Sequence, residues 1–430
     1  MTKPTCNGCQ EYNNLNRRAF LKGSAVSLSA LMAAPAWMPR VAFAGAENSD
    51  RDVIISIYLR GGADGLTLCT PYFEDRYYAL RPSISVPRPD SGDPNAGTAL
   101  DDFFMLPPAM TGLLPAFDAL DLCVVHACGS QDDTRSHFDA QYFMETGEPG
   151  NNGLDTGWLG RHILNSAPMD AQAVLRAASI SNAIPDMLLG SPQTLPIPNP
   201  ADFSLSLGGG NPEQRLLTLE ALYANAAEPL KTSAENTQAV FDLLDSIDFE
   251  NYVPAGSAVY PENDNLSRGL KATAALIKAE AGVEAIAMDA GSWDTHVNQG
   301  SITGFMANNM QSLADSLGAF HADVIASGDY NVTVVVMSEF GRVAWQNGSG
   351  GTDHGHGGCM FVLGNNINGG QVITQWPGLE GEDLYEGQDL DVTIDYRDVL
   401  AEIVQNRLGN NNLATVFPNY APTFQGITTV

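Results

Sequence analysis

One loop of the sequence concentrates side chains that bind metals or carry protons. In the stretch Gly350–Gly358, Asp353, His354 and His356 stand among glycines and almost no bulky residues. The chain has only 7 histidines, and a loop without apolar neighbours offers no core in which to bury two of them. We therefore predict a metal-binding or active-site role for this segment.

Other acids stand near a second histidine or an arginine. Asp294 and His296 are two positions apart, so one loop can present both to a single cation; the alternative is a surface Asp and a hydrogen-bonded His. Glu339 is a further candidate ligand, and Arg342 suits bidentate binding of an oxyanion. Asp64 stands in a Gly-Gly-x-Asp-Gly turn, where it is a candidate ligand or a turn-forming residue.

A hydroxyl-bearing segment, Asp132–Asp139, leads into a predicted helix. Free N–H groups and the helix dipole favour negative charge at such a position, so a hydroxyl there suits a nucleophile that receives phosphate or sulfate. Ser136 and Thr134 are the candidates, and each could instead be a simple N-cap. Where the helix starts decides between them. His137 follows directly and is a candidate partner of the nucleophile.

These residues need a scaffold that brings them together, and the apolar pattern predicts one. Five short apolar runs read as strands buried on both faces, as in a parallel sheet: Val53–Leu59, Leu122–Ala127, Val283–Met288, Val332–Met337 and Met360–Leu363. Helical periodicity at 266–277 and 306–324 lies between them, which predicts an α/β sheet covered on both sides. The candidate residues follow strand ends, where such sheets bind ligands. His321 is expected to be a boundary or core residue.

Composition limits the partners. The 430 residues hold 21 Lys plus Arg against 50 Asp plus Glu, a net charge of -29. This charge argues against nucleic acid or an anionic membrane as the main partner. We predict one α/β domain over residues 45–430, with a helical insertion near 205–260. Four cysteines of this domain could be buried thiols or include one disulfide: Cys69, Cys123, Cys128 and Cys359.

Residues 1–44 are predicted to be an export signal. Asn16–Lys22 resembles the twin-arginine translocation motif, a short apolar segment follows, and Ala42–Ala44 offers a cleavage pattern. The alternative is a helical or disordered arm. We expect the precursor to use the twin-arginine export machinery and the mature chain to be periplasmic or secreted, without a transmembrane anchor.

The order of these motifs resembles a known family. The segments are Gly61–Leu66, Ser136–Phe138, Trp293–His296, Glu339–Arg342 and Gly351–Gly357. They are similar to the sulfatase-like family called domain of unknown function 1501, within the alkaline phosphatase superfamily, over nearly the whole mature chain. The resemblance implies a three-layer α/β sandwich with a mostly parallel central sheet flanked by helices.

The resemblance also implies a two-metal site. It would place Asp294, His296 and His354 around one cation and Asp64, Glu339 and Ser136 around another, with Ser136 as nucleophile. Glu339 is followed by Phe340 where the superfamily has Asp-His, so His137 or His356 would have to supply the missing imidazole.

The expected function is therefore a metal-dependent hydrolase of phosphate or sulfate esters, acting on a small-molecule or polymer ester. It would use one or two divalent cations per chain, Zn²⁺ first, with Mn²⁺, Mg²⁺ or Ca²⁺ as alternatives. No Cys-x-Pro-x-Arg sequence is present, which disfavours ordinary sulfatase chemistry. The alternative function is a catalytically degenerate member that serves as a cation-binding or envelope-associated binding protein.

Overall fold

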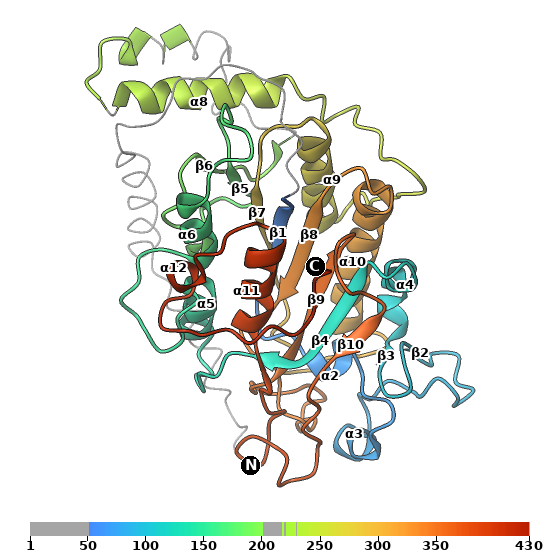
Figure 1. Ribbon diagram of the computed structural model, residues 1–430. Coiled ribbons are helices and arrows are strands. Elements are labelled where there is room, and N and C mark those ends of the chain that lie inside the picture. The colour runs from blue at the N-terminus through green and yellow to red at the C-terminus, as the bar shows by residue number, and fades with distance from the viewer. Residues whose placement is uncertain (1–50, 201–216, 219–220, 229, 430) are drawn as a thin grey trace, which may run out of the picture. The chain divides into compact units, whose positions relative to one another are not determined.

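The chain divides into two compact units, and one of them holds the candidate residues. A computed structural model describes residues 51–200, 217–218, 221–228 and 230–429 (Figure 1). The larger unit comprises Ala42–Asp202 and Ser246–Val430, and the smaller comprises Met1–Val41 and Phe203–Asp245. The smaller unit contains helix α8 (Leu230–Asp245), which falls inside the stretch predicted as a helical insertion. The predicted export signal at 1–44 lies outside the described residues.

A nine-stranded sheet forms the centre of the larger unit. Its order is β10 (Gln371–Ile373), β4 (Leu122–Gly129), β9 (Gly358–Gly364), β8 (Val332–Met337), β1 (Val53–Leu59), β7 (Ala285–Ala290), β5 (Ala177–Ser179) and β6 (Thr194–Pro196), with β11 (Ile394–Asp395) paired to β4. All five predicted strands are present, and four short ones were not predicted. Every residue of β1 and β8 is buried, as expected for central strands covered on both faces.

One predicted strand runs in the opposite direction from expectation. β9 is antiparallel to both β4 and β8, whereas the remaining pairs of this sheet are parallel. β8 and β9 are neighbours joined by a loop over 338–357 without a crossover helix, and a parallel pair would require a crossover. The reversal brings the start of β9, with His354 just before it, to the edge where the parallel strands end.

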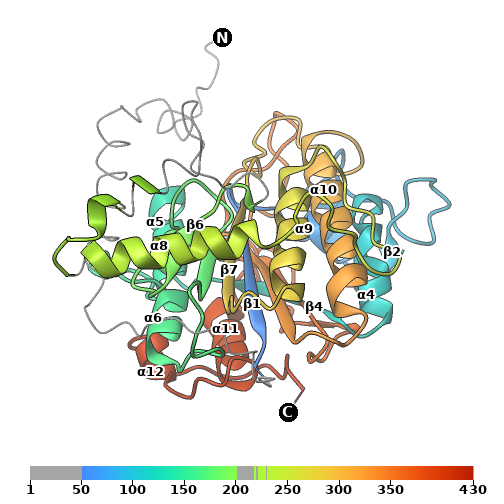
Figure 2. The ribbon, with the colours of Figure 1, turned by 90° about the horizontal axis from the view of Figure 1, so that it is seen from above.

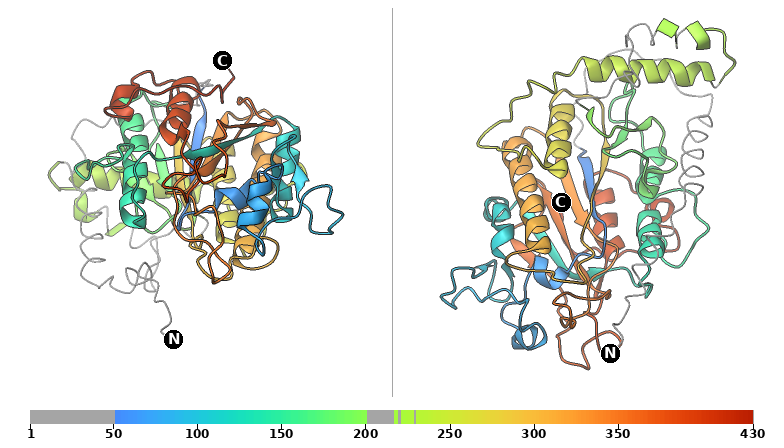
Figure 3. Two further views of the ribbon diagram at one scale, coloured as in Figure 1. Left: turned by 90° about the horizontal axis from the view of Figure 1, so that it is seen from below. Right: turned by 180° about the vertical axis from the view of Figure 1, so that it is seen from behind.

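Helices cover the sheet on both sides, which makes the unit a mixed, mostly parallel α/β fold (Figures 2 and 3). One face carries α5 (His137–Thr146), α6 (Trp158–Asn165), α11 (Tyr396–Asn406) and α12 (Leu413–Val416), whose apolar side chains share a core with alternate residues of the strands. The other carries α4 (Leu114–Asp118), α9 (Asn265–Lys278) and α10 (Phe305–Phe320).

Shorter elements connect these layers. They are α2 (Gly65–Leu68), α3 (Asp75–Leu80), the hairpin β2 (Thr98–Ala99) and β3 (Met105–Leu106), the 3₁₀ turns Pro108–Leu113 and Asp186–Leu188, and a π-helical turn, His321–Ile325, that extends α10. His321 is buried there and its Nε2 lies 2.8 Å from Asp121 Oδ2, which confirms a structural role.

Two further expectations meet the structure here. The four cysteines named above are buried free thiols, which settles the choice between thiols and a disulfide. Across the described part of the chain, none of the helices combines the length and the apolar character needed to span a bilayer.

Candidate metal centre

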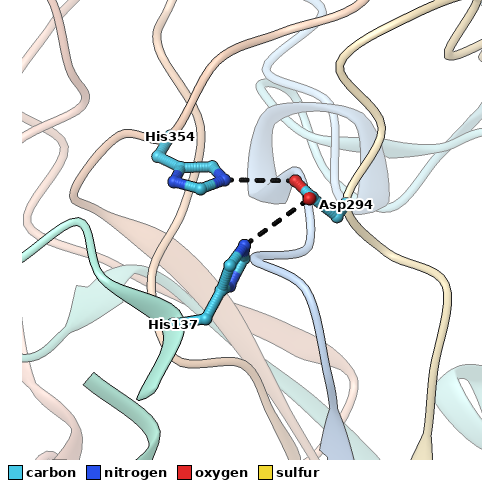
Figure 4. A group of neighbouring side chains, drawn as sticks. All are labelled: His137, Asp294 and His354. Atoms are coloured by element: carbon cyan, nitrogen blue, oxygen red, sulfur yellow. Dashed lines mark hydrogen bonds and ion pairs between the residues drawn. The ribbon is translucent and has the colours of Figure 1, made fainter. Parts of the chain in front are cut away.

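Four side chains from three loops meet at the carboxyl edge of the sheet. His137 opens α5 after β4, Asp294 and His296 lie in the loop after β7, and His354 precedes β9. Figure 4 shows that His137 and His354 both point at the carboxylate of Asp294, each toward a different oxygen. We call these four residues the His–Asp cluster.

The ligand-type atoms of three cluster residues, His137, Asp294 and His354, lie within coordination range of one another. His354 Nε2 is 3.1 Å from Asp294 Oδ1, and His137 Nε2 is 3.6 Å from Oδ2. One ligand atom from each of these three residues lies within 4.8 Å of the others. His296 Nε2 is 2.8 Å from Asp294 Oδ1 and 2.9 Å from His354 Nε2. Tetrahedral coordination at ~2.0–2.1 Å separates ligand atoms by roughly 3.3–3.5 Å, so the contacts of His354 and His137 with Asp294 are close to those of a single small cation, whereas the two contacts of His296 are shorter.

The outer nitrogens of the three imidazoles fix which atom faces the cluster. Nδ1 of His137 is 2.8 Å from Glu339 Oε1, and Nδ1 of His296 is 2.9 Å from Asp353 Oδ1. Nδ1 of His354 is 2.9 Å from the carbonyl of Arg135. Carboxylates and carbonyls only accept, so each Nδ1 donates, and a neutral ring then presents its Nε2 lone pair to the cluster.

When the rings are neutral, the Nε2 lone pairs of the three imidazoles therefore converge on the carboxylate of Asp294. His296 Nε2 and His354 Nε2 face each other at 2.9 Å, and His137 Nε2 is buried without a hydrogen-bond partner among the described residues. A shared cation resolves both features. Three imidazoles with one carboxylate suit Zn²⁺ and similar transition metals, whereas Mg²⁺ and Ca²⁺ prefer sets of oxygen ligands.

Electrostatics point to the same need for positive charge. Burial lowers the pKa of His137, but the nearby carboxylates of Asp294 and Glu339 outweigh burial and raise that pKa to about 9. Burial raises the pKa of Asp294, but hydrogen bonds from the three imidazoles, with the charge of Arg342, hold it far below the usual range. The carboxylates of Asp294 and Glu339 thus stabilise the protonated, positively charged form of His137. A bound metal would supply positive charge at the same place.

Glu339 lies behind His137 and does not join the cluster. Its carboxylate is buried, and Oε1 accepts hydrogen bonds from the Gly61 N–H, His137 Nδ1 and Gln141 Nε2, each at 2.8 Å. These donors hold the pKa of Glu339 low although burial alone would raise it. Glu339 was predicted as a metal ligand, and the structure instead gives it the carboxylate–imidazole contact that orients a ligand ring.

Arg342 is committed to the scaffold of the site. Its buried guanidinium donates to the carbonyls of Gly62 (2.6 Å), Thr352 (2.9 Å) and Trp293 (3.1 Å), to that of Gly61, and to Asp294 Oδ1 (2.7 Å). Each nitrogen already donates and the side chain is fully buried, which argues against the predicted binding of an oxyanion. Arg342 ties three loops together and holds Asp294 so that Oδ2 faces His137.

Asp64 belongs to a different cluster. Arg81 Nη2 is 3.0 Å from its Oδ1 and Nη1 is 2.5 Å from its Oδ2, and both residues are fully buried. Thr67 and Gln299 donate to Oδ2 at 2.8 and 2.7 Å. A guanidinium thus fills the position of the cation that was predicted for Asp64, and the carboxylate does not approach the His–Asp cluster. Arg81 had no signal in the sequence, because only the fold brings it to Asp64.

Comparison with known families covers the second half of the chain. Residues 211–412 match the family described as Protein of unknown function (DUF1501). The match supports the resemblance to DUF1501, and it includes Asp294, His296 and His354 but not His137. No curated protein matches the chain.

The two other candidate residues of the loop Gly350–Gly358, Asp353 and His356, lie outside the cluster. Asp353 has a side chain 62% exposed and accepts from His296 Nδ1 and, at 3.1 Å, from Asn347. His356 stacks on Tyr385 with ring centroids 4.3 Å apart, and burial lowers its pKa. Of the three residues predicted in this loop, His354 belongs to the cluster, Asp353 bonds to the outer nitrogen of His296, and His356 packs against Tyr385.

The helix start favours Ser136 over Thr134. α5 begins at His137, so Ser136 is its N-cap residue, and its side chain makes no capping hydrogen bond. Thr134 lies two residues earlier, and its Oγ1 accepts from the Ser136 N–H at 3.3 Å. By the criterion set from the sequence, Ser136 is the candidate nucleophile.

Phe340 packs against the rings of His137 and His354, a role that the sequence did not predict. Its ring centroid lies 5.0 Å from that of His137 and 4.9 Å from that of His354. Gly62 makes room for it, because a Cβ there would come 2.4 Å from Phe340 Cε2, and its φ is +67°. In the sequence, Phe340 was noted only because it stands where the superfamily has a histidine. In the structure, its ring holds two imidazoles in place.

Proposed function

We propose that the protein is an exported metal-dependent hydrolase of phosphate or sulfate esters with one cation per chain. The observation that supports it most strongly is the convergence of three Nε2 atoms on Asp294, each on a ring whose Nδ1 is held by another acceptor. The position at the carboxyl edge of an α/β sheet, the alkaline phosphatase-like order of motifs and the twin-arginine-like signal at residues 1–44 agree with it.

His137, Asp294 and His354 would hold the cation, with His296 as a fourth donor. Zn²⁺ suits this set best, and Mn²⁺, Mg²⁺ and Ca²⁺ are the alternatives. A divalent cation supplies Lewis-acid stabilisation of ester oxygens and eases the loss of a proton from a hydroxyl. One cation is proposed because Glu339 is bonded to His137, and Asp64 to Arg81.

Ser136 would act as nucleophile at the positive end of α5. Its Oγ makes no capping bond, so the hydroxyl is available to a substrate, and the helix N-terminus favours the negative charge that develops during attack. His137, next in the chain, fixes the first turn of the helix through Glu339. Arg342 would hold Asp294 in place, with no contact to the substrate.

Ester turnover by Ser136→Ala tests the proposal, with Thr134→Ala as the matched control. Zinc-loaded wild type should hydrolyse an aryl phosphate or aryl sulfate, and Ser136→Ala should lower kcat by on the order of 10³-fold or more with metal content unchanged. Thr134→Ala should stay within a few-fold of wild type. Equal turnover in wild type and Ser136→Ala would refute the mechanism.

A cation-binding or envelope-associated role without catalysis is the second candidate. The observation that favours it is the pairing of Asp64 with Arg81, which removes half of the two-metal site that the resemblance implies. Stable metal binding with no hydrolysis of either ester class by wild type would favour this role.

A further inference from the structure

A second pocket lies beside α9, away from the His–Asp cluster. It has a volume of about 270 Å³ and shares no residue with the cluster. Side chains from the start of α9 and from the segment before it line the pocket, together with Asn199, which follows β6. Figure 2 shows α9 next to α10 on one side of the sheet. Ligands of open α/β sheets bind near the carboxyl ends of strands such as β6.

Two basic side chains that form no ion pair with a described carboxylate line the pocket. Most described Arg and Lys side chains pair with an acid, but Arg268 and Lys271 have no carboxylate within 4.0 Å among the residues that the structure describes. Arg268 donates to the neutral amide of Asn265. One acid, the exposed Glu262, also lines the pocket. In a chain of net charge -29, such a local excess of cations is a feature to explain.

A buried hydroxyl in the same pocket lacks a partner. Ser267 is fully buried, and its Oγ makes no hydrogen bond to any described residue. Its N–H is bonded to Asp264 Oδ1 at 2.9 Å, so the backbone is satisfied and the hydroxyl is not. Leaving a buried hydroxyl unpaired costs about 1–3 kcal/mol. An oxygen of a bound anion would pair with it.

Two aromatic residues form another part of the pocket wall. Phe249 and Tyr260 line the pocket, and the Tyr260 hydroxyl is bonded to Asp323 Oδ2 at 2.9 Å, which fixes the ring. A flat apolar group can pack against such rings while its charged end reaches the cations and the hydroxyl.

We propose that this pocket binds a small organic anion, with its phosphate, sulfate or carboxylate group at Arg268, Lys271 and Ser267 and a planar apolar portion against Phe249 and Tyr260. The site is separate from the His–Asp cluster, so the proposal stands whether or not the protein hydrolyses esters.

Calorimetric titration of the full protein with phenyl phosphate tests this proposal. Wild type should bind it, Arg268→Gln/Lys271→Gln should weaken binding about tenfold or more, and Ser267→Ala should weaken it several-fold. Lys231→Gln, which removes a lysine paired with Glu235 in α8, is the matched control and should bind as wild type does. Phenol and inorganic phosphate should each bind more weakly than phenyl phosphate.

Binding at the metal centre is distinguished by Asp294→Asn. That variant should retain phenyl phosphate affinity if the ligand occupies the pocket at α9. Unchanged affinity in Arg268→Gln/Lys271→Gln, loss of binding in Asp294→Asn, or no binding by wild type would each overturn the proposal. Equal affinity for inorganic phosphate would overturn the requirement for a planar group.

Discussion

The His–Asp cluster and the Asp64–Arg81 cluster each place an aspartate just past the end of a strand, yet they differ in what neutralises it. Asp64 receives a guanidinium, a hydroxyl and an amide from the protein itself. Asp294 receives the Arg342 guanidinium at Oδ1 and also faces Nε2 atoms whose rings already donate through Nδ1 to other acceptors. Both carboxylates are paired with a buried arginine, but only Asp294 also faces imidazole nitrogens of the kind that bind a transition metal. The hydrogen-bond and ion-pair partners of an aspartate therefore distinguish a structural carboxylate from a metal ligand. Its residue type and its position after a strand do not.

Breaking the Asp64–Arg81 pair should have the largest effect on stability. Asp64→Asn leaves the buried Arg81 charge uncompensated, so the free energy of unfolding should fall by about 3–5 kcal/mol, measured by urea denaturation. Zinc binding to the folded variant should match that of wild type. Replacing both partners, Asp64→Leu with Arg81→Met, should recover part of the loss. Loss of zinc from folded Asp64→Asn would contradict the separation of the two clusters.

Asp294→Asn should affect the metal instead. A structural zinc site contributes about 10–16 kcal/mol over four ligands, so removing one ligand weakens binding by about 10²–10³-fold. Competition with a chromophoric chelator measures the affinity. The variant also removes the carboxylate partner of the buried Arg342, so the apo variant should be less stable than apo wild type, and the affinity is measured on protein shown to be folded. An affinity equal to that of wild type would exclude Asp294 as a ligand.

His126 is an imidazole with partners at both nitrogens and so sharpens the comparison with the cluster. Nε2 is 2.9 Å from the Cys69 carbonyl, and Nδ1 accepts from the Ala127 N–H at 2.8 Å. The neutral ring is therefore satisfied, and burial lowers the pKa of His126 to about 4 from the ordinary 6.5.

The sign of the pH dependence follows from this shift. Between pH 4 and 6.5 the unfolded chain binds the proton that the folded chain rejects, so stability is complete above pH 6.5 and is lost as the pH falls toward 4. The contribution of His126 is on the order of 3 kcal/mol. Unfolding free energies of wild type and His126→Gln across this range measure it. The variant should show a smaller slope, and parallel curves would contradict the assignment.

Glu339→Gln should have the smallest of these effects. Gln retains an oxygen that can accept from His137 Nδ1 but loses the charge that makes the imidazole a stronger donor. Metal affinity should fall by about 10–100-fold, with stoichiometry unchanged. The visible spectrum of the Co²⁺-substituted protein should shift, which a change of folding stability alone would not produce. An unchanged affinity and spectrum would mean that His137 is not a ligand.

The sequence predicted the positions of strands better than the contacts that individual side chains make. The strands Val53–Leu59 and Val332–Met337 were recovered residue for residue, because β-branched runs buried on both faces have few other interpretations. The direction of β9 was not recovered, since its apolar run reads alike in either direction.

The site was predictable in its residue types and only partly in its geometry. Asp294, His296 and His354 were expected together and lie together. Arg342 and Asp64 were expected to face a substrate or metal, but contacts with Gly61 and Arg81 from distant positions occupy them. Such contacts depend on tertiary packing, which spacing along the chain does not encode.

Metal content of the mature protein, purified without chelator, tests the central claim most directly. Elemental analysis should find one transition metal per chain in wild type, one in Asp64→Asn, and none in His354→Ala. Two metals in wild type, or a metal that remains in His354→Ala and leaves in Asp64→Asn, would contradict the assignment of the cation to the His–Asp cluster.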